Sequence, residues 1–170
     1  STILSGASIN GGYTWDIKRI SGPSAIAANE TVAVKYTTST ARTINNTTPT
    51  IIYENKVLDT HAAYNTSTGV FTVPVGGTYI FLGGFGLTGV ATTVGHNNIL
   101  RVFVDGALAT DLAAAIATTT SSVTWRSYGS TSLPLLAGQL VTFRFYADTT
   151  NTLLASQPES NHISIARIGL

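Results

Sequence analysis

The sequence contains no cysteine and no methionine, and it is poor in charge. The absence of cysteine excludes disulfide bonds, thiolate metal sites and cysteine nucleophiles together. Only 10% of the residues are Asp, Glu, Lys or Arg, whereas soluble domains usually contain about 25%. A monomer with so few charges is poorly protected against association. We therefore expect much of the surface to be covered by copies of the same chain or by a larger particle.

Two classes of partner are disfavoured by what the chain lacks. The nine Lys and Arg residues are scattered and the net charge is only +1, whereas phosphate binding needs clustered cations, so nucleic acid is not an expected partner. No apolar run approaches the roughly 18 residues of a membrane span, so membrane insertion is not expected. The segment 1–10 has neither a basic start nor an apolar run and does not read as a secretory leader.

Motifs for catalysis and cofactors are also missing: the sequence has no nucleophile elbow, P-loop, zincin helix or nucleotide fingerprint. The strongest catalytic or metal candidate is Asp59-Thr60-His61, whose acid and imidazole would share one strand face. His96 and Asp148 could join it only if folding brings them close. Because metal sites need three or four ligands, these residues do not predict a bound metal. Since catalytic and cofactor motifs are missing as well, we expect no cofactor and no enzymatic activity.

Strand patterns dominate what is present. Apolar residues recur at every second position in the segments 32–36, 100–104 and 141–146, which places them on one face of a sheet. Turn signals such as Asp105-Gly106 separate these segments. With 44% hydrophobic residues over 170 positions, the chain can form one domain with a sizeable core. The pattern predicts an all-β sandwich, jelly roll or barrel. Residues 110–117 are too short for a stable helix and read as a loop or an edge strand.

The first 30 residues differ from the rest. Several glycines and a proline punctuate them, around one strand-like segment at 13–20. We interpret residues 1–30 as an N-terminal arm or linker and residues 31–170 as the folded domain. Trp15, in the arm, is a candidate anchor that docks on a neighbour.

The segment 64–81 is the most informative part of the chain. It reads Tyr-Asn-Thr-Ser-Thr-Gly-Val-Phe, and then Pro-Val-Gly-Gly-Thr-Tyr-Ile-Phe from Pro74. It resembles the signature of C1q-like domains, in which Tyr-Asp-x-x-Thr-Gly-x-Phe leads into Pro-x-x-Gly-x-Tyr-x-Phe. The resemblance implies a C1q/TNF-like jelly-roll β-sandwich that assembles as a homotrimer and acts by binding or by building rather than by catalysis.

The resemblance extends over about four fifths of the chain. Val104-Asp105-Gly106 is similar to the Asn-Gly hairpin of the family. The leucine-rich segment 133–141 resembles the segment that leads into the family's Gly-Asp-x-Val turn. The last strand, 160–170, ends where family domains end. Three features depart from the family: the usual cysteine pair is missing, Gln139 replaces an Asp, and the segment 163–166 replaces Phe-Ser-Gly-Phe. With these departures the chain resembles the divergent C1q-like domains that are found on phage and bacterial surfaces.

Two groups of residues are candidates for function. The first consists of aromatic rings that the resemblance places in the core or along a threefold axis: Phe71, Tyr79, Phe81, Phe143 and Phe145. The second is a possible recognition surface formed by Trp125, Arg126 and Tyr128, because aromatic rings beside polar groups commonly make sugar-binding and protein-binding surfaces. Alternatively, Trp125 closes the end of the barrel. His162 is expected to be an ordinary surface or interface residue.

The resulting hypothesis is a non-enzymatic homotrimer on the virion surface of a bacteriophage. Residues 1–30 would attach it to the major capsid protein or to a fibre shaft. The domain would serve either as a capsid decoration or cement protein or as a fibre-tip knob that touches a host surface glycan or protein. The alternative is a secreted or surface carbohydrate-binding, lectin-like module.

Overall fold

The computed structural model describes residues 6–9, 12–15, 30–45, 47–92, 94–118, 121–153 and 158–169. The chain divides into two compact units, residues 1–30 and residues 31–170. In the first unit, β1 (Gly6–Ile9) pairs antiparallel with β2 (Gly12–Trp15). Of the strand predicted at 13–20, residues 13–15 belong to β2 and residues 16–20 lie outside the described part.

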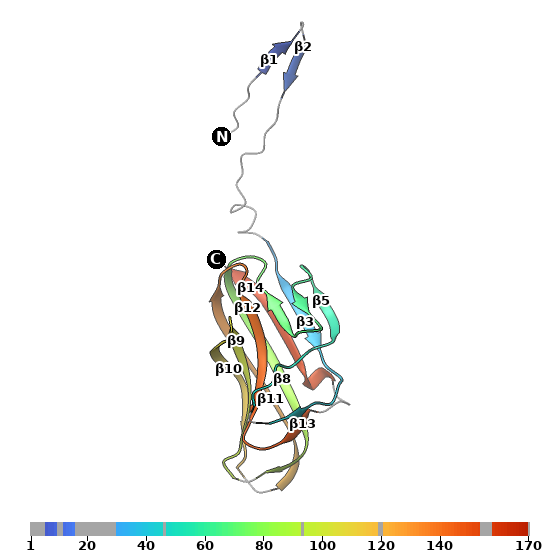
Figure 1. The fold of residues 1–170 in the computed structure, drawn as a ribbon, viewed down its shortest axis with the longest axis vertical. Coiled ribbons are helices and arrows are strands. Elements are labelled where there is room, and N and C mark those ends of the chain that lie inside the picture. Colours follow the sequence, from blue (N-terminus) through green and yellow to red (C-terminus); the bar gives the residue numbers. More distant parts are fainter. Residues whose placement is uncertain are drawn as a thin grey trace. The chain divides into compact units, whose positions relative to one another are not determined.

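The second unit consists of two antiparallel sheets packed face to face (Figure 1). The five-stranded sheet has the order β10 (Ala107–Ile116), β9 (Asn97–Val104), β12 (Leu140–Ala147), β7 (Val70–Thr72) and β6 (Tyr64–Asn65). The seven-stranded sheet contains β4 (Thr43–Ile44), β13 (Asn151–Leu153), β8 (Gly77–Thr92), β14 (His162–Gly169), β3 (Ala33–Thr37), β5 (Asn55–Asp59) and β11 (Ser121–Leu135). A short 3₁₀ helix, η1 (Pro158–Ser160), precedes β14.

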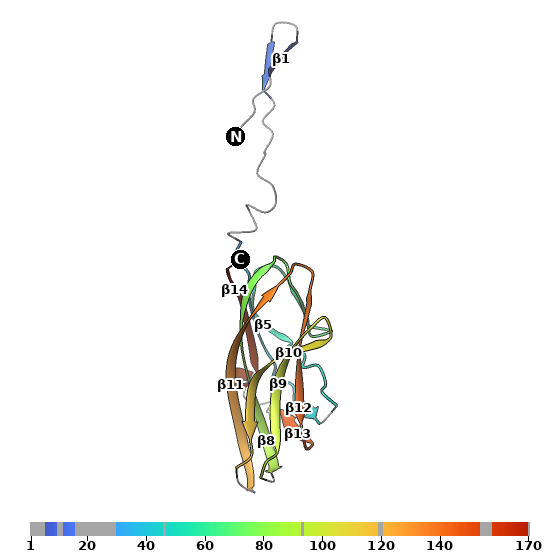
Figure 2. The same cartoon turned by 90° about the vertical axis from the view of Figure 1, so that its left-hand side faces the viewer.

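Strand β8 is the centre of the seven-stranded sheet. Its 16 residues pair with β11 along one edge and with β14 and then β13 along the other. Figure 2 shows β8 and β11 running side by side along the length of the domain. The all-β jelly-roll sandwich predicted from the sequence is confirmed. No helix among the described residues is long and apolar enough to cross a membrane.

Aromatic side chains from the two sheets meet in the core. Phe85 contacts Phe145 edge-on with ring centroids 4.7 Å apart, and the ring centroids of Phe81 and Phe143 are 6.1 Å apart. Tyr79 is fully buried, and its hydroxyl donates a hydrogen bond of 2.6 Å to the Val75 carbonyl. The polar atom of the buried ring therefore has a partner. Alternation puts these rings inward and leaves the intervening residues of the same strands outward.

The alternating segments lie in β3, β9 and β12 as predicted, except for Val32, which directly precedes β3. Residues 110–116 belong to β10, an edge strand of the five-stranded sheet. Strand β8 extends beyond the end of the signature segment at Phe81 and continues to Thr92.

Gln139 has a structural role in the place where the family has Asp. Its side-chain amide donates to the Asp105 carboxylate at 2.9 Å, and Asp105 also accepts the Leu140 amide at 2.9 Å. Asp105 adopts a left-handed conformation with φ 50° at this turn. These hydrogen bonds hold two turns at the same end of the sheet together.

We predict that Phe143→Ala lowers the free energy of unfolding by about 3–5 kcal/mol, because it empties a fully buried site between Tyr53 and Phe81. Leu140→Ala on the same strand is the control. Leu140 is 47% exposed, so its truncation should change stability by no more than about 0.5 kcal/mol. Urea unfolding at fixed protein concentration measures both, and equal losses would contradict this description of the core.

Candidate functional site on the seven-stranded sheet

The outer face of the seven-stranded sheet is formed by the residues that alternate with core residues along β11, β8, β14 and β3. The strand register arranges these residues in rows across the sheet. The rows are Tyr128, Gly84, His162 and Thr37; Ser130, Leu82, Ser164 and Lys35; and Ser132, Ile80, Ala166 and Ala33. Most side chains in these rows are small or apolar, and Lys35 is the one that carries a permanent charge.

Tyr128 lies across β8 because its neighbour in the row is a glycine. A Cβ atom on Gly84 would approach the Tyr128 ring to 2.3 Å, so any larger residue would push the ring away. The ring reaches over the strand to His162, with centroids 5.9 Å apart and an interplanar angle of 30°. The tyrosine hydroxyl lies 3.4 Å from the Ser160 hydroxyl. Tyr128 nevertheless remains 56% exposed, and its outer surface can contact another molecule.

A shallow hollow of about 330 Å³ opens beside His162. It is lined by Lys35 and Thr37 from β3, Val57 from β5, Pro158 and Glu159 from η1, and His162 from β14. The His162 ring is oriented by a hydrogen bond of 2.9 Å from Nδ1 to the Glu159 carbonyl, which fixes the proton on Nδ1 in the neutral ring. The hollow combines an aliphatic wall with one amine, one imidazole and one carboxylate, which suits polar and apolar side chains of a docked protein surface.

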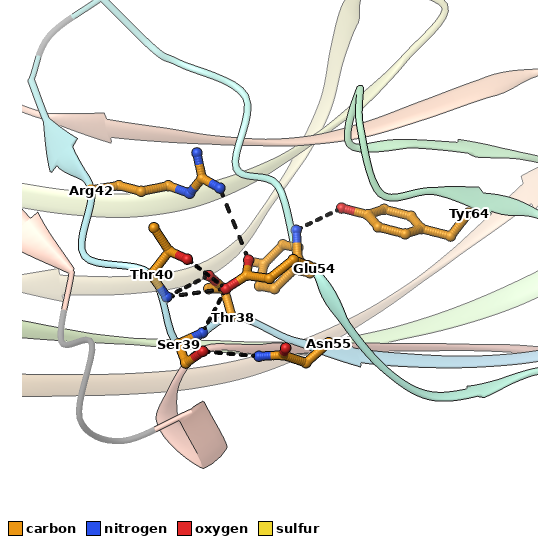
Figure 3. A network of polar contacts seen from close by, with 8 residues as sticks. Thr38, Ser39, Thr40, Arg42, Glu54, Asn55 and Tyr64 are labelled. Carbon is orange, nitrogen blue, oxygen red and sulfur yellow. Dashed lines mark hydrogen bonds and ion pairs between the residues drawn. The ribbon is translucent and has the colours of Figure 1, made fainter.

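The loop beside the hollow is held by Glu54, which precedes β5 (Figure 3). One of its carboxylate oxygens accepts hydrogen bonds from the amides of Ser39 and Thr40 and from the Thr40 hydroxyl at 2.7–3.1 Å. The other oxygen lies 3.9 Å from the Arg42 guanidinium. The next residue, Asn55, donates to the Ser39 hydroxyl at 3.1 Å. This network joins the end of β3 to the start of β5, the two strands that carry three of the residues lining the hollow.

Hydrogen bonding keeps the Glu54 carboxylate charged. Partial burial by itself raises the pKa of Glu54, but hydrogen bonds from Thr38, Thr40 and backbone amides outweigh that effect and bring the pKa below its ordinary value of 4.5. The negative charge is therefore part of the folded loop at neutral pH.

The Asp59-Thr60-His61 candidate is a turn rather than a reactive pair. Asp59 accepts the amides of His61, Ala63 and Tyr64 at 3.0–3.2 Å, together with the Tyr36 hydroxyl at 3.1 Å. Although burial raises its pKa, these hydrogen bonds lower the pKa of Asp59 further than burial raises it. The His61 ring lies 2.7 Å from the Thr60 hydroxyl. The carboxylate is thus used in closing the turn.

His96 and Asp148 are not brought to Asp59. Asp148 accepts the amide and the side chain of Asn97, at the start of β9, at 2.8 and 3.0 Å. Asp59 instead lies beside Tyr64. Across the five-stranded sheet, Tyr64 pairs with Phe71, Phe71 with Val141, and Val141 with Val104, which is at the opposite end of β9. The length of that strand, roughly 24 Å, separates the two ends. Within the described ranges no three His, Asp or Glu side chains form a group that could hold a metal ion.

The structure separates the residues of the predicted recognition surface. Along β11, Arg126 and Tyr128 point outward, whereas the partly buried Trp125 packs against the core. A surface that uses Tyr128 therefore cannot use Trp125. Trp15 lies in β2, and its side chain is outside the described part of the structure.

The five predicted core or axis rings all lie between the sheets. Phe71, Tyr79, Phe81, Phe143 and Phe145 are completely buried within one copy of the chain. They build the sandwich and are not available on its outer face. The residues on that face which the sequence analysis missed include Leu82 and Lys35. Their positions between inward residues of β8 and β3 were a usable signal, since every second residue of a one-sided strand faces away from the core.

Comparison with known proteins identifies the fold. A family model described as the C1q domain matches residues 33–162. Among solved structures, the globular domain of a zebrafish complement 1qA protein is 18% identical, with a TM-score of 0.58, 82% of this chain covered and 97% of that one. The Eiger TNF of S. frugiperda is 15% identical (TM-score 0.62, coverage 82% and 93%), and murine APRIL is 13% identical (TM-score 0.59, coverage 82% and 100%). A search of curated proteins gave no match.

We predict that Glu54→Gln lowers the free energy of unfolding at neutral pH by about 1–3 kcal/mol, because charge-assisted hydrogen bonds are lost. The folded pKa of Glu54 lies below the unfolded one, so its contribution is complete above the unfolded pKa and disappears as pH falls through the folded value. The difference between wild type and Glu54→Gln should therefore shrink between about pH 6 and pH 3.

Glu159→Gln is the matched control for this measurement. Glu159 is exposed and takes no part in the hydrogen bonds of Glu54, so the same change there should leave stability nearly unaltered. Chemical unfolding monitored across this pH range tests the prediction. A Glu54→Gln deficit that stays constant down to pH 3 would show that the charge of Glu54 does not stabilise the loop.

Proposed function

Since the chain belongs to the C1q domain family, we propose that it is a non-enzymatic structural or binding module that assembles as a homotrimer through the outer face of its seven-stranded sheet. The observation that carries this proposal is the composition of that face. Leu82 is 42% exposed at its centre and is flanked in its row by Ser130 and Ser164. A flat face of small and apolar side chains allows close approach of another backbone.

Tyr128 projects from this otherwise flat face, and the hollow forms a recess in it. Tyr128 stands as an exposed ring beside His162, and the hollow lies on the other side of that histidine. A projecting ring and a recess on the same face are features that an interface between copies can match against each other. The scarcity of charge over the whole chain supports the same proposal, because a surface covered by copies needs few charges for solubility.

A binding or building role is favoured over catalysis by the placement of the reactive residues. Asp59 is occupied by four hydrogen-bond donors, and the pair formed by His96 and Asp148 lies near the other end of β9. Among the described residues that line the hollow, no nucleophile is held against a base. General acid–base or nucleophilic chemistry requires such groups within hydrogen-bond reach of each other.

Residues 1–30 are proposed as the attachment segment of the trimer. Val32 accepts a hydrogen bond of 3.0 Å from the Arg167 amide, so the domain begins beside its last strand. In a threefold assembly the three arms would enter their domains at the same end, so that all three could attach to one surface of a larger particle. We place the module on a virion surface of a bacteriophage, as a capsid decoration or cement protein bound to the major capsid protein or as a fibre-tip knob.

The carbohydrate-binding alternative rests on the exposed ring of Tyr128. A solvent-exposed tyrosine can stack against a sugar, but its proposed partner Trp125 faces the core. Glycan-array binding that disappears in Tyr128→Ala would favour this alternative over the structural role.

We predict that Leu82→Glu reduces the oligomer to single chains at low micromolar concentration, because it places a carboxylate without a partner in the covered face. Leu108→Glu is the control. Leu108 is 52% exposed on β10 of the other sheet, so the same change there should leave the assembly intact. Light scattering measures the masses and circular dichroism checks the fold. An unchanged mass for folded Leu82→Glu would contradict the proposed interface.

Removal of residues 1–28 should leave a folded homotrimer that no longer attaches to its particle, because the contacts of residues 31–170 form a compact unit of their own. The shortened chain is compared with the full chain by solution mass and by cosedimentation with particles that lack the protein. Loss of the trimer itself would refute the assignment of these residues to attachment.

A further inference from the structure

The outer face of the five-stranded sheet carries two arginines directly opposite each other. Arg144 of β12 and Arg101 of β9 are register partners, and both lie on the side of the sheet that faces away from the core. Like charges opposite each other on neighbouring strands are destabilising. In a chain with only nine Lys and Arg residues, this arrangement needs a physical explanation.

The two side chains avoid each other by stacking on aromatic rings in opposite directions. The Arg144 guanidinium carbon lies 4.3 Å from the ring centre of Phe103, two residues beyond Arg101 along β9. The Arg101 guanidinium carbon lies 4.6 Å from the ring centre of Tyr146, two residues beyond Arg144 along β12. Cation–π contacts of this kind hold a guanidinium in place at a low cost in desolvation.

The two arginines differ in their remaining partners. Arg101 forms an ion pair with Asp111 of β10, with Nε and Oδ1 2.9 Å apart. Arg144 instead donates from Nε to the Thr142 hydroxyl at 3.3 Å, and no carboxylate of the described residues forms an ion pair with it. The face thus presents one compensated and one uncompensated guanidinium.

The geometry specifies the kind of ligand that would fit. With Nε engaged by Thr142, the terminal nitrogens of Arg144 still provide donors in one plane, a pattern that matches the two oxygens of a carboxylate. The rings of Phe103 and Tyr146 each have one face occupied by a guanidinium, and that face is not available for stacking on a sugar. A single uncompensated cation is also too little charge for a polyanion that is held by many phosphates or sulfates.

We propose that Arg144, positioned by Phe103 and Thr142, is a binding site for a carboxylate side chain of an acidic polypeptide partner. Arginine and aromatic residues are enriched at protein–protein interfaces and lysine is depleted, which agrees with the two Arg–aromatic pairs of this face. This site is distinct from the surface proposed for self-association, because it lies on the outer face of the other sheet.

The test uses the full chain and a fluorescently labelled oligo-glutamate peptide, with binding followed by fluorescence anisotropy at low ionic strength. Arg144→Gln should weaken binding by about tenfold, because a charge-assisted pair is removed. Arg144→Lys keeps the charge but not the planar pair of donors, and should weaken binding by about threefold. Lys56→Gln removes one positive charge from an exposed position on β5 and should change binding by less than about twofold.

A labelled oligogalacturonate of equal carboxylate number separates acidic sugar from acidic polypeptide. The proposal predicts weaker binding of this sugar and little response to Arg144→Gln. Three results would overturn it: no saturable binding of oligo-glutamate at millimolar concentration, equal losses for Arg144→Gln and Lys56→Gln, or oligogalacturonate binding that is as tight and as dependent on Arg144. Circular dichroism of each variant confirms that the fold is retained.

Discussion

The domain depends on aromatic contacts between its two sheets. Phe81 and Phe85 of β8 meet Phe143 and Phe145 of β12 across the core, and Tyr79 meets Phe71 in the same way. Because β8 and β12 are central strands of their sheets, these contacts fix the distance and the register between the two layers. Burial of such rings supplies a large share of the hydrophobic stabilisation of a sandwich.

The same alternation that buries the rings determines what the two outer faces offer. On β8, the residues between the rings include Leu82 and the glycines at 84 and 86, which leave a flat face over which Tyr128 can lie. On β12 and β9, the residues that alternate with core residues include Arg144 and Arg101, which stack on neighbouring aromatic side chains of the outer face. One face suits contact with another copy of the chain, and the other presents a fixed cation to a different partner.

Much of the fold could be predicted from the sequence, because period-two alternation is a local signal. It located β3, β9 and β12, and the signature segment identified the jelly roll before any contact was known. The outer-face site could not be predicted, since it depends on register: only the pairing of β8 with β11 on one edge and with β14 on the other brings Tyr128 beside His162. The sequence predicts one surface from Trp125 and Tyr128, but their odd separation along β11 puts them on opposite faces.

The central claim is that the open face of the seven-stranded sheet is covered by copies of the chain. The most direct test is the mass of the unmodified protein in solution, measured by light scattering at low micromolar concentration. The account predicts three times the chain mass of 17.8 kDa. A stable mass of a single chain would contradict it, and would leave the scarcity of charge and the exposed Leu82 without the explanation given above.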